Sequence, residues 1–407
     1  MRESGTFSHR EPGSACGPRA FMRALWMVFS VLATATVEAA ELTAPAPSRD
    51  FYFPNTEELA PDEMRVIALG TGTPHIRPVQ AATSWLVELG NGDKFLFDVG
   101  TGSLRNFAGL QISYNDVYRV FFSHLHVDHV GDFDALWASG WTGGRLRPLQ
   151  VWGPSGTEPR LGTRHYVETL RDAMYWDYAT RSGILPEIGS GIEVHEFDYS
   201  QAQVVYEENG VTVRSFPSVH ILDGAVSYRL EWKGLSFVFS GDVTPNKWMV
   251  EYGKNVDLLV HEVYMTIGQL MEHFGWDRQM AMTVSRRVHT TPAAAGEMFS
   301  LLQPRMAVGF HFYNDPDTAP EIEREIRKAY DGPLTLARDL TVFNLRPGSI
   351  HVRQAVTPQR TWPMVPDRED FARAKRAQPR KMSDWLRAGQ LPIDIYTRPE
   401  DSGAGAQ

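Results

Sequence analysis

The chain has 407 residues, a formal net charge of −9 at pH 7 and 43% hydrophobic residues. This length suits one large domain or two small ones, and the composition is ordinary for a globular protein. The acidic balance disfavours a nucleic-acid partner held by phosphate contacts, although it leaves a small phosphate ester open.

Residues 1–40 are expected to be a pre-sequence and an export signal. Two arginines precede an uncharged apolar stretch, Ala24 to Val37, which has the length of a signal-peptide core and is too short to span a bilayer. Val37-Glu38-Ala39 offers small residues for cleavage, and Met22 is an alternative start to Met1. The mature protein would be periplasmic or secreted, with no stable membrane anchor. A buried helix is the alternative interpretation of the stretch.

The only cysteine, Cys16, lies upstream of this cleavage point. The mature protein would therefore contain neither a disulfide nor a thiolate ligand. Any metal ion would have to be held by His, Asp and Glu side chains.

The main domain is expected over residues 62–350. A proline- and alanine-rich linker at 41–61 precedes it, and a C-terminal extension at 351–407, expected to be partly disordered, follows. The first half of the domain is expected to contain these elements in chain order: a strand at Met64–Leu69, a turn at Gly70–Pro74, a β-hairpin of Ser84–Leu89 and Lys94–Asp98, a helix at Leu104–Leu110, a strand at Val117–Ser123 and a helix at Asp132–Ala138.

Residues 140–190 differ in composition, with three tryptophans, several tyrosines and scattered Gly and Pro. We interpret them as an insertion that covers the functional site and contacts the substrate. An aromatic-rich packing subdomain is the alternative.

A second set of strands and helices follows. Strands are expected from Ile192, at Val204–Tyr206, Val211–Ser215, Tyr228–Trp232, Leu235–Ser240, Val256–His261 and Met306–His311, and helices at about 264–273, 292–302 and 320–330. Two successive β-rich halves with helices outside predict an α+β fold, an αββα sandwich.

One short segment suggests metal binding. His124, His126, Asp128 and His129 directly follow an apolar strand. Imidazole and carboxylate suit zinc, manganese or iron. His124 and His126 are two residues apart, so in extended geometry both point to one face and can share an ion. Asp128 and His129 follow where the chain must turn, and could reach a second ion.

Three later residues complete the set of candidate ligands. His220 follows a strand, Asp242 stands where a strand ends in a glycine turn, and His311 ends an apolar run. Two cations about 3.5–4 Å apart need a bridging anionic ligand, and Asp242 could provide it. Each of these residues alone is a weak signal, but in this order they predict a binuclear site.

Together these motifs resemble the metallo-β-lactamase superfamily over roughly Met64 to Asn344. The resemblance implies that the first metal takes His124, His126 and His220. It implies that the second takes Asp128, His129 and His311, with Asp242 bridging the two.

Further motifs resemble the ribonuclease Z and arylsulfatase branch of the superfamily: Leu69-Gly-Thr-Gly-Thr-Pro74, Asp98-Val-Gly-Thr-Gly102, Val260-His-Glu262 and Val288-His-Thr-Thr291. In that branch the equivalent of His289 meets the reacting phosphate and the equivalent of Glu262 holds it. The overall pattern is also similar to exported bacterial hydrolases of the guanitoxin-pathway type. No segment resembles the tRNA-gripping arm of ribonuclease Z. With the acidic charge and the export signal, its absence predicts that the chain binds no nucleic acid.

The sequence therefore predicts a binuclear metal-dependent hydrolase that uses a hydroxide between two divalent ions, zinc before manganese or iron. Asp128 would orient the hydroxide, and His289 would assist the leaving group. The expected substrate is a small ester, first a phosphodiester or sulfate ester. A lactone or amide is the alternative, as is a non-catalytic exported metal-binding protein. The sequence leaves the oligomeric state open.

The remaining histidines have no motif support. His261 is expected to be structural, and the rest are expected at the surface or in ordinary packing, with His75 nearest the site: His75, His165, His195, His273 and His351. Serine hydrolysis is not supported, because Gly153-Pro-Ser155-Gly156 lacks the nucleophile-elbow pattern.

Overall fold

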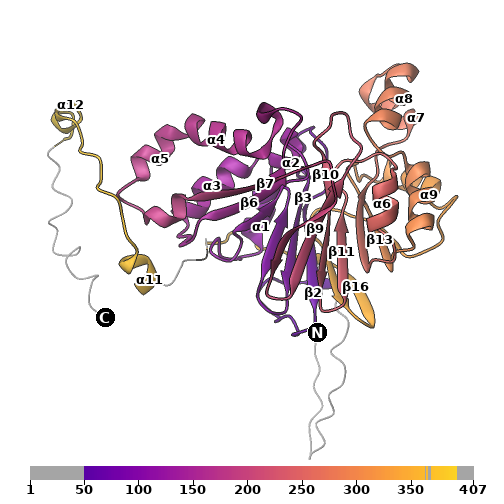
Figure 1. Ribbon diagram of the computed structural model, residues 1–407, viewed down its shortest axis with the longest axis horizontal. Helices are drawn as coiled ribbons and strands as arrows, with labels where there is room; N and C mark the ends of the chain where they lie inside the picture. Colours follow the sequence, from indigo (N-terminus) through magenta and orange to yellow (C-terminus); the bar gives the residue numbers. More distant parts are fainter. Residues whose placement is uncertain (1–49, 363, 365–367, 392–407) are drawn as a thin grey trace, which may run out of the picture. The chain divides into compact units, whose positions relative to one another are not determined.

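A computed structural model describes residues 50–362, 364 and 368–391. The predicted export signal at 1–40, Cys16 and residues 41–49 of the predicted linker lie outside the described residues, as do residues 392–407 of the C-terminal extension. Within the described residues, two β-sheets lie face to face between two layers of helices (Figure 1). This arrangement confirms the predicted α+β class and αββα layering.

The larger sheet has nine strands among the described residues, in the order β1-β16-β15-β2-β3-β4-β5-β6-β7. Its strands are β1 Phe51–Tyr52, β2 Met64–Gly70, β3 Ser84–Leu89, β4 Lys94–Phe97, β5 Arg119–Phe121, β6 Leu149–Pro154, β7 Ile192–Phe197, β15 Thr341–Arg346 and β16 Ser349–Ala355. The predicted hairpin is present as the antiparallel pair β3 and β4.

The second sheet has the order β14-β13-β12-β11-β10-β9-β8. Its strands are β8 Gln203–Glu208, β9 Val211–Pro217, β10 Val226–Trp232, β11 Leu235–Phe239, β12 Leu258–Glu262, β13 Met306–Phe310 and β14 Leu334–Leu336. Strands β11 to β14 are parallel to one another, so their carboxyl ends share one edge of the sheet.

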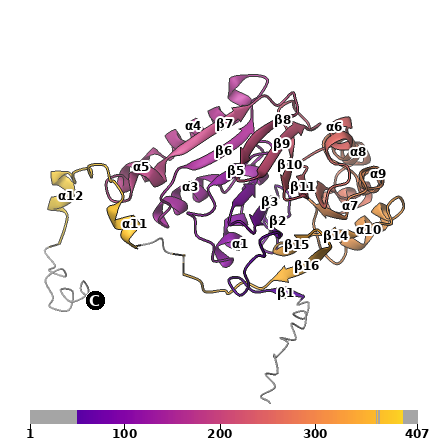
Figure 2. The same cartoon turned by 60° about the horizontal axis from the view of Figure 1, so that its bottom comes forward.

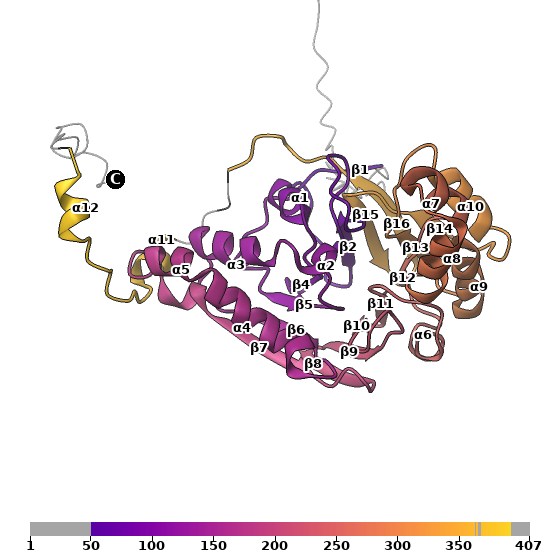
Figure 3. The same ribbon diagram turned by 90° about the horizontal axis from the view of Figure 1, so that it is seen from above.

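The helices divide between the two outer faces (Figure 3). One group accompanies the larger sheet: α1 Ser103–Gly109, α2 Val127–Val130, α3 Phe133–Thr142, α4 Thr163–Ala173 and α5 Tyr175–Arg181. The other accompanies the second sheet: α6 Lys247–Tyr252, α7 Ile267–Phe274, α8 Arg278–Arg287, α9 Pro292–Leu302 and α10 Ala319–Ile326. The extension contributes α11 Arg368–Arg373 and α12 Asp384–Ala388, and the short 3₁₀ helices are η1 Pro159–Leu161 and η2 Glu187–Ser190.

Three apolar cores correspond to the three interfaces between these layers. The middle core joins the two sheets and includes Trp85, Phe97, Tyr228 and Phe310, all fully buried. A second core packs α1, α3 and α4 on the larger sheet, and a third packs α6 to α10 on the second sheet. Because both faces of each sheet are buried, most strands consist of continuous hydrophobic runs rather than alternating polar and apolar residues.

Three sequence interpretations need correction. β7, expected to open the second set of strands at Ile192, instead pairs with β6 in the larger sheet. β6 itself lies within 140–190, and its buried residues make it part of that sheet rather than of an insertion. The expected boundary at 350 falls inside β16, which pairs with β15 and β1 and thus belongs to the domain (Figure 2).

Among the described residues, no helix combines the length and apolarity that crossing a membrane requires.

Candidate metal centre

The predicted site residues gather where strands of the two sheets end. The segment from His124 to His129 follows β5, and His220 follows β9. Asp242 follows β11, Glu262 ends β12, and His311 directly follows β13. Since β11, β12 and β13 are parallel, their carboxyl ends meet at one edge, as in other open α/β sheets that bind ligands there.

A first group of possible ligands consists of His124, His126, His220 and Asp242, with one donor atom from each within 4.8 Å of the others. His124 Nε2 lies 3.0 Å from His126 Nδ1, and His220 Nε2 lies 3.4 Å from the same atom. The backbone of His126 is extended, and both histidines belong to one group, as their spacing predicts.

A second group consists of Asp128, His129, His311 and the same Asp242, again within 4.8 Å. Asp128 and His129 lie on α2, a four-residue helix that the sequence interpretation described only as a turn. His311 has a φ of 73°, a left-handed conformation that is costly for a residue with a Cβ. The fold thus holds His311 in a strained position at the centre.

Asp242 lies between the two groups. Its Oδ1 lies 3.2 Å from His129 Nε2 and 3.4 Å from His311 Nε2. Its Oδ2 lies 3.9 Å from both His124 Nε2 and His220 Nε2. One oxygen therefore faces each group, which is the geometry expected of a bridging carboxylate.

Hydrogen bonds fix which nitrogen of each imidazole faces the centre. His220 Nδ1 lies 2.8 Å from the carbonyl oxygen of Val288, which can only accept, so this nitrogen carries the proton. His129 Nδ1 donates to Asp98 Oδ2 at 2.6 Å. In His220 this leaves Nε2 without a proton and directed to the centre, as a metal-ligating histidine requires, and His129 Nε2 is likewise directed to the centre, 3.2 Å from Asp242 Oδ1.

Asp98 is a site residue to which sequence reasoning assigned no role. It is fully buried, its Oδ1 accepts the backbone N–H of Ser123 at 2.8 Å, and its Oδ2 accepts the Ser123 hydroxyl at 2.6 Å. The same hydroxyl oxygen lies 3.1 Å from His124 Nδ1. Asp98 thus orients one histidine of each group. The sequence feature that could have indicated this role is the position of Asp98 at the end of a strand, before Gly100-Thr-Gly102.

The histidine pKa values shift in opposite directions in the first group and at His311 of the second. Burial lowers the pKa values of His124, His126 and His220, so these imidazoles are neutral and able to donate lone pairs. Burial also opposes charge on His311, but Asp242 and Asp128 outweigh it and raise the pKa of His311 to about 10. Burial raises the pKa of Asp242, yet His311 and His129 bring it well below its ordinary value. The second group is thus held together by opposite charges.

The side chains fit a divalent cation at the centre. His129 Nε2 and Asp242 Oδ1 are buried and lack a hydrogen-bond partner among the described residues. Unsatisfied buried polar atoms are rare unless an ion or a water completes them. Imidazole and carboxylate donors without thiolate suit zinc, manganese or iron. The clusters therefore indicate divalent metal binding.

Glu262 and His289 form the pair expected from the motifs. His289 Nδ1 lies 2.8 Å from Glu262 Oε2, while Glu262 Oε1 accepts the backbone N–H of Val243. The Tyr264 ring stacks on His289 with centroids 4.3 Å apart. The imidazole is therefore held by a buried carboxylate and a ring, and its side chain is 11% exposed beside the metal groups.

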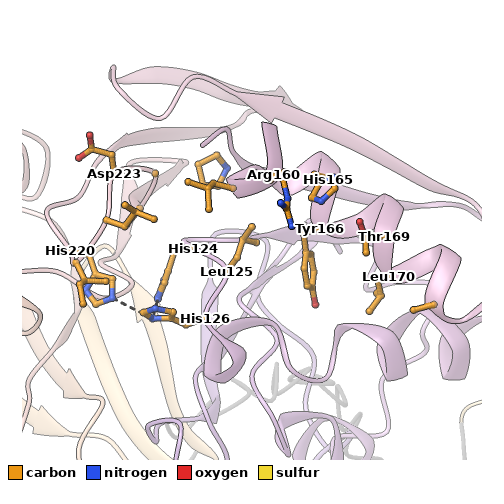
Figure 4. Close-up of a pocket in the computed structure, with 17 residues that line it drawn as sticks. His124, Leu125, His126, Arg160, His165, Tyr166, Thr169, Leu170, His220 and Asp223 are labelled. Carbon is orange, nitrogen blue, oxygen red and sulfur yellow. Dashed lines mark hydrogen bonds between the residues drawn. The ribbon is translucent and has the colours of Figure 1, made fainter. Parts of the chain in front are cut away.

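A cavity of about 530 Å³ opens beside the first group and is lined by His124, His126 and His220 together with residues of α4 (Figure 4). His165, expected at the surface or in packing, is exposed and lines this cavity. His75 is exposed and contacts the rings of Phe274 and Tyr313. His261 is fully buried beside Phe299 and lies in none of the ligand groups, in keeping with the structural role expected of it.

Comparisons with known proteins agree with this geometry. The family model described as "Beta-lactamase superfamily domain" matches residues 93–312. Ribonuclease Z of Mycobacterium marinum is 30% identical over 206 residues, covering 49% of this chain and 70% of the relative. Ribonuclease Z of Mycolicibacterium paratuberculosis is 31% identical over 205 residues, with the same coverage. These relatives weigh against the prediction that the chain binds no nucleic acid, without settling its substrate.

Solved structures extend the likeness in fold. A metallo-beta-lactamase fold protein of Bacillus subtilis has a TM-score of 0.53 at 16% identity and covers 70% of this chain and 100% of its own. The short form of human tRNase Z has a TM-score of 0.51 at 20% identity and covers 68% of this chain and 98% of its own. The sandwich is therefore of the metallo-β-lactamase type.

Proposed function

Since the chain belongs to the beta-lactamase superfamily, as a ribonuclease Z-like hydrolase, we propose that it hydrolyses a small ester with two divalent metal ions. A phosphodiester or sulfate ester is the first substrate class. We propose zinc as the metal, and export from the cell, as the N-terminal sequence predicts.

The position of Asp242 carries the proposal of two ions. Its two oxygens face different groups of histidines, at 3.2 and 3.4 Å on one side and 3.9 Å on the other. A single-ion site would need only one of these groups. Two ions bound here supply a water of lowered pKa, and thus hydroxide near neutral pH, together with charge stabilisation at the reacting centre.

The protein's own residues would orient the attacking oxygen and protonate the leaving oxygen. Asp128 Oδ2 lies 3.1 Å from His311 Nε2, which holds this carboxylate toward the centre, where it can orient the attacking oxygen. Glu262 fixes His289 through Nδ1, so that Nε2 is the atom able to give a proton to the leaving oxygen. Burial opposes charge on Glu262, but the interaction with the neighbouring His289 outweighs it and lowers the pKa of this carboxyl, so Glu262 acts as an acceptor.

A second candidate is RNA cleavage. The 31% identity to ribonuclease Z across 49% of the chain favours it. The net charge of −9 argues against it, because binding to RNA backbones relies on cationic side chains. Lactone or amide hydrolysis and metal binding without turnover are further alternatives that the same centre allows.

A panel of substrates on the zinc-loaded protein tests the proposal: bis(p-nitrophenyl) phosphate, p-nitrophenyl sulfate, an aliphatic lactone and a precursor tRNA. We expect turnover of the phosphodiester or sulfate that is lost in Asp242→Ala and kept in the matched variant Asp331→Ala, whose carboxylate is exposed. Cleavage of the tRNA alone would overturn the small-ester proposal. No turnover of any substrate would overturn the enzymatic one.

A further inference from the structure

The cavity beside the first ligand group is lined mainly by apolar side chains. The three histidines His124, His126 and His220 form one end, and α4 and the segment after β9 form the walls (Figure 4). The apolar lining includes Leu125, Leu161, Leu170, Ala173, Ile221 and Leu222. Its volume of about 530 Å³ lies in the range of cavities that enclose small molecules.

Several of these apolar side chains are open to water. Ile221 is 63% exposed, Leu222 55% and Leu161 38%. They line one cavity together with the histidines of the first group. Single exposed apolar residues scattered over a surface are ordinary, but a cluster of them around a cavity indicates a binding site. A ligand that covers them is stabilised by the removal of apolar surface from water.

The basic groups of this cavity are few. Arg160 and His165 lie together on the α4 side in Figure 4, and Asp223 supplies a negative charge on the other wall. An RNA chain would need a succession of cationic and stacking side chains. The lining suits a compact molecule with one anionic centre better than a polyanion.

His289 borders a different cavity, of about 600 Å³, and is not part of the apolar one. The lining of this second cavity is more polar and includes Thr266, Ser285, Arg286, Thr291, Glu321 and Glu325. In the proposed reaction His289 protonates the leaving oxygen, so the leaving group would lie on the side of this second cavity. The part of the substrate that stays on the reacting centre would then lie on the side of the apolar one.

We infer that the cavity between α4 and residues 219–225 binds an alkyl or aryl group on the retained side of the ester. This inference rests on the proposed function. For a phosphodiester, the water oxygen forms a bond to phosphorus while the bond to the leaving oxygen breaks. One proton of the water reaches the leaving oxygen through His289, and the other leaves to solvent or stays on the phosphate. The products are an alcohol and a phosphate monoester that still carries the apolar group.

Two substrates with one leaving group test the inference. In p-nitrophenyl methyl phosphate and p-nitrophenyl hexyl phosphate only the retained group differs, by five methylenes. The zinc-loaded protein should show a kcat/KM roughly 30-fold higher for the hexyl ester, since partial burial captures part of the gain per methylene. The gain should lie mainly in KM, because the chemical step is the same.

Matched variants locate the effect. Leu222→Gln should reduce the hexyl-to-methyl ratio by about threefold or more, because it replaces part of the apolar wall. Leu301→Gln is the control: Leu301 is also 55% exposed but lies on α9, outside both cavities. Thr169→Trp, at an exposed position of α4 that lines the cavity, should fill it and bring the ratio near one.

Calorimetric binding of hexylphosphonate and methylphosphonate separates this inference from the proposed function. Tighter binding of hexylphosphonate without hydrolysis of any ester would support the cavity assignment and contradict the enzymatic proposal. Hydrolysis with a hexyl-to-methyl ratio near one, or equal effects of the Leu222 and Leu301 variants, would overturn the inference alone.

Discussion

At the scale of single residues, the centre depends on partners that hold three of its imidazoles by Nδ1. Asp98 holds His129, the Ser123 hydroxyl stands beside His124, and the Val288 carbonyl holds His220. The carboxylate and the carbonyl accept from Nδ1, and in all three rings Nε2 is left to point to the centre. The ligands themselves follow from local motifs, but these partners come from segments far apart in the chain. Sequence patterns therefore predicted the residues that gather in these groups, but assigned no role to Asp98.

Asp98→Asn should weaken metal binding without unfolding the protein. An amide has one acceptor oxygen, so it cannot satisfy both Ser123 and His129 as the carboxylate does. We expect zinc affinity to fall about 10- to 100-fold, measured by competition with a chromogenic chelator. Asp257→Asn is the control, a buried carboxylate that accepts from Ser236 away from the centre. Equal affinities of the Asp98 variant and the unmodified protein would contradict this role.

His289→Ala should cost more activity when the leaving group is poor. A proton donor matters most where the leaving oxygen is basic, so we expect losses of about 10²-fold or more for alkyl leaving groups and much smaller losses for p-nitrophenolate. The measurement is kcat/KM across phosphodiesters of graded leaving-group pKa, with metal content checked in each preparation. A loss independent of the leaving group would show that His289 acts in some other way.

At the scale of elements, the centre is built by the turns that end strands rather than by the strands. The turn after β11 is tight: Gly241 has a φ of 56°, and a Cβ there would lie 2.5 Å from Ser123 Cβ. It brings Asp242 against the segment that follows β5. Periodicity predicted these strands well because most are buried and apolar over their whole length. Several helices were not predicted, among them α2, which is very short, α8, which has low apolar content, and α4, α5 and α6.

Comparing Gly241→Ala with Gly234→Ala distinguishes the cost of placing a Cβ at a positive φ from the cost of a steric clash with neighbouring atoms. Both glycines have positive φ, 56° and 77°, but a Cβ on Gly234 meets no atom within 4 Å. We expect Gly234→Ala to lower the free energy of unfolding by about 1 kcal/mol, and Gly241→Ala by at least about 2 kcal/mol. Only Gly241→Ala should also reduce the metal content. Denaturant unfolding and metal analysis check this, and similar losses in both would refute the packing argument.

At the scale of the whole molecule, the two sheets do not correspond to two successive halves of the chain. Strands β15 and β16 come late in the sequence and return to the larger sheet beside β2. The sequence analysis placed the end of the domain at residue 350, because no local sequence pattern indicates that β15 and β16 pair with the larger sheet. The pairing depends on contacts across some 280 residues, such as Val342 with Ile67, which no short pattern encodes. The layer architecture was predictable, but the strand order was not.

Shortening the chain at its C-terminal side tests this boundary. A variant ending at residue 350 loses most of β16, and with it the partner of both β15 and β1. We expect it to aggregate, since an exposed β15 edge invites pairing between chains. A variant ending at residue 361 keeps β16 and should remain folded by circular dichroism. Equal thermal stability of the two variants would show that β16 is dispensable.

The most direct test of the account is the number of metal ions per chain. Mass spectrometric metal analysis of the zinc-loaded protein should give about two zinc ions per chain, because Asp242 directs one oxygen to the group of His124 and His220 and the other to the group of His129 and His311. In Asp242→Asn the value should fall to about one or less, and in Asp331→Ala it should not change. A value below one in the unmodified protein, or an unchanged value of two in Asp242→Asn, would contradict the binuclear centre.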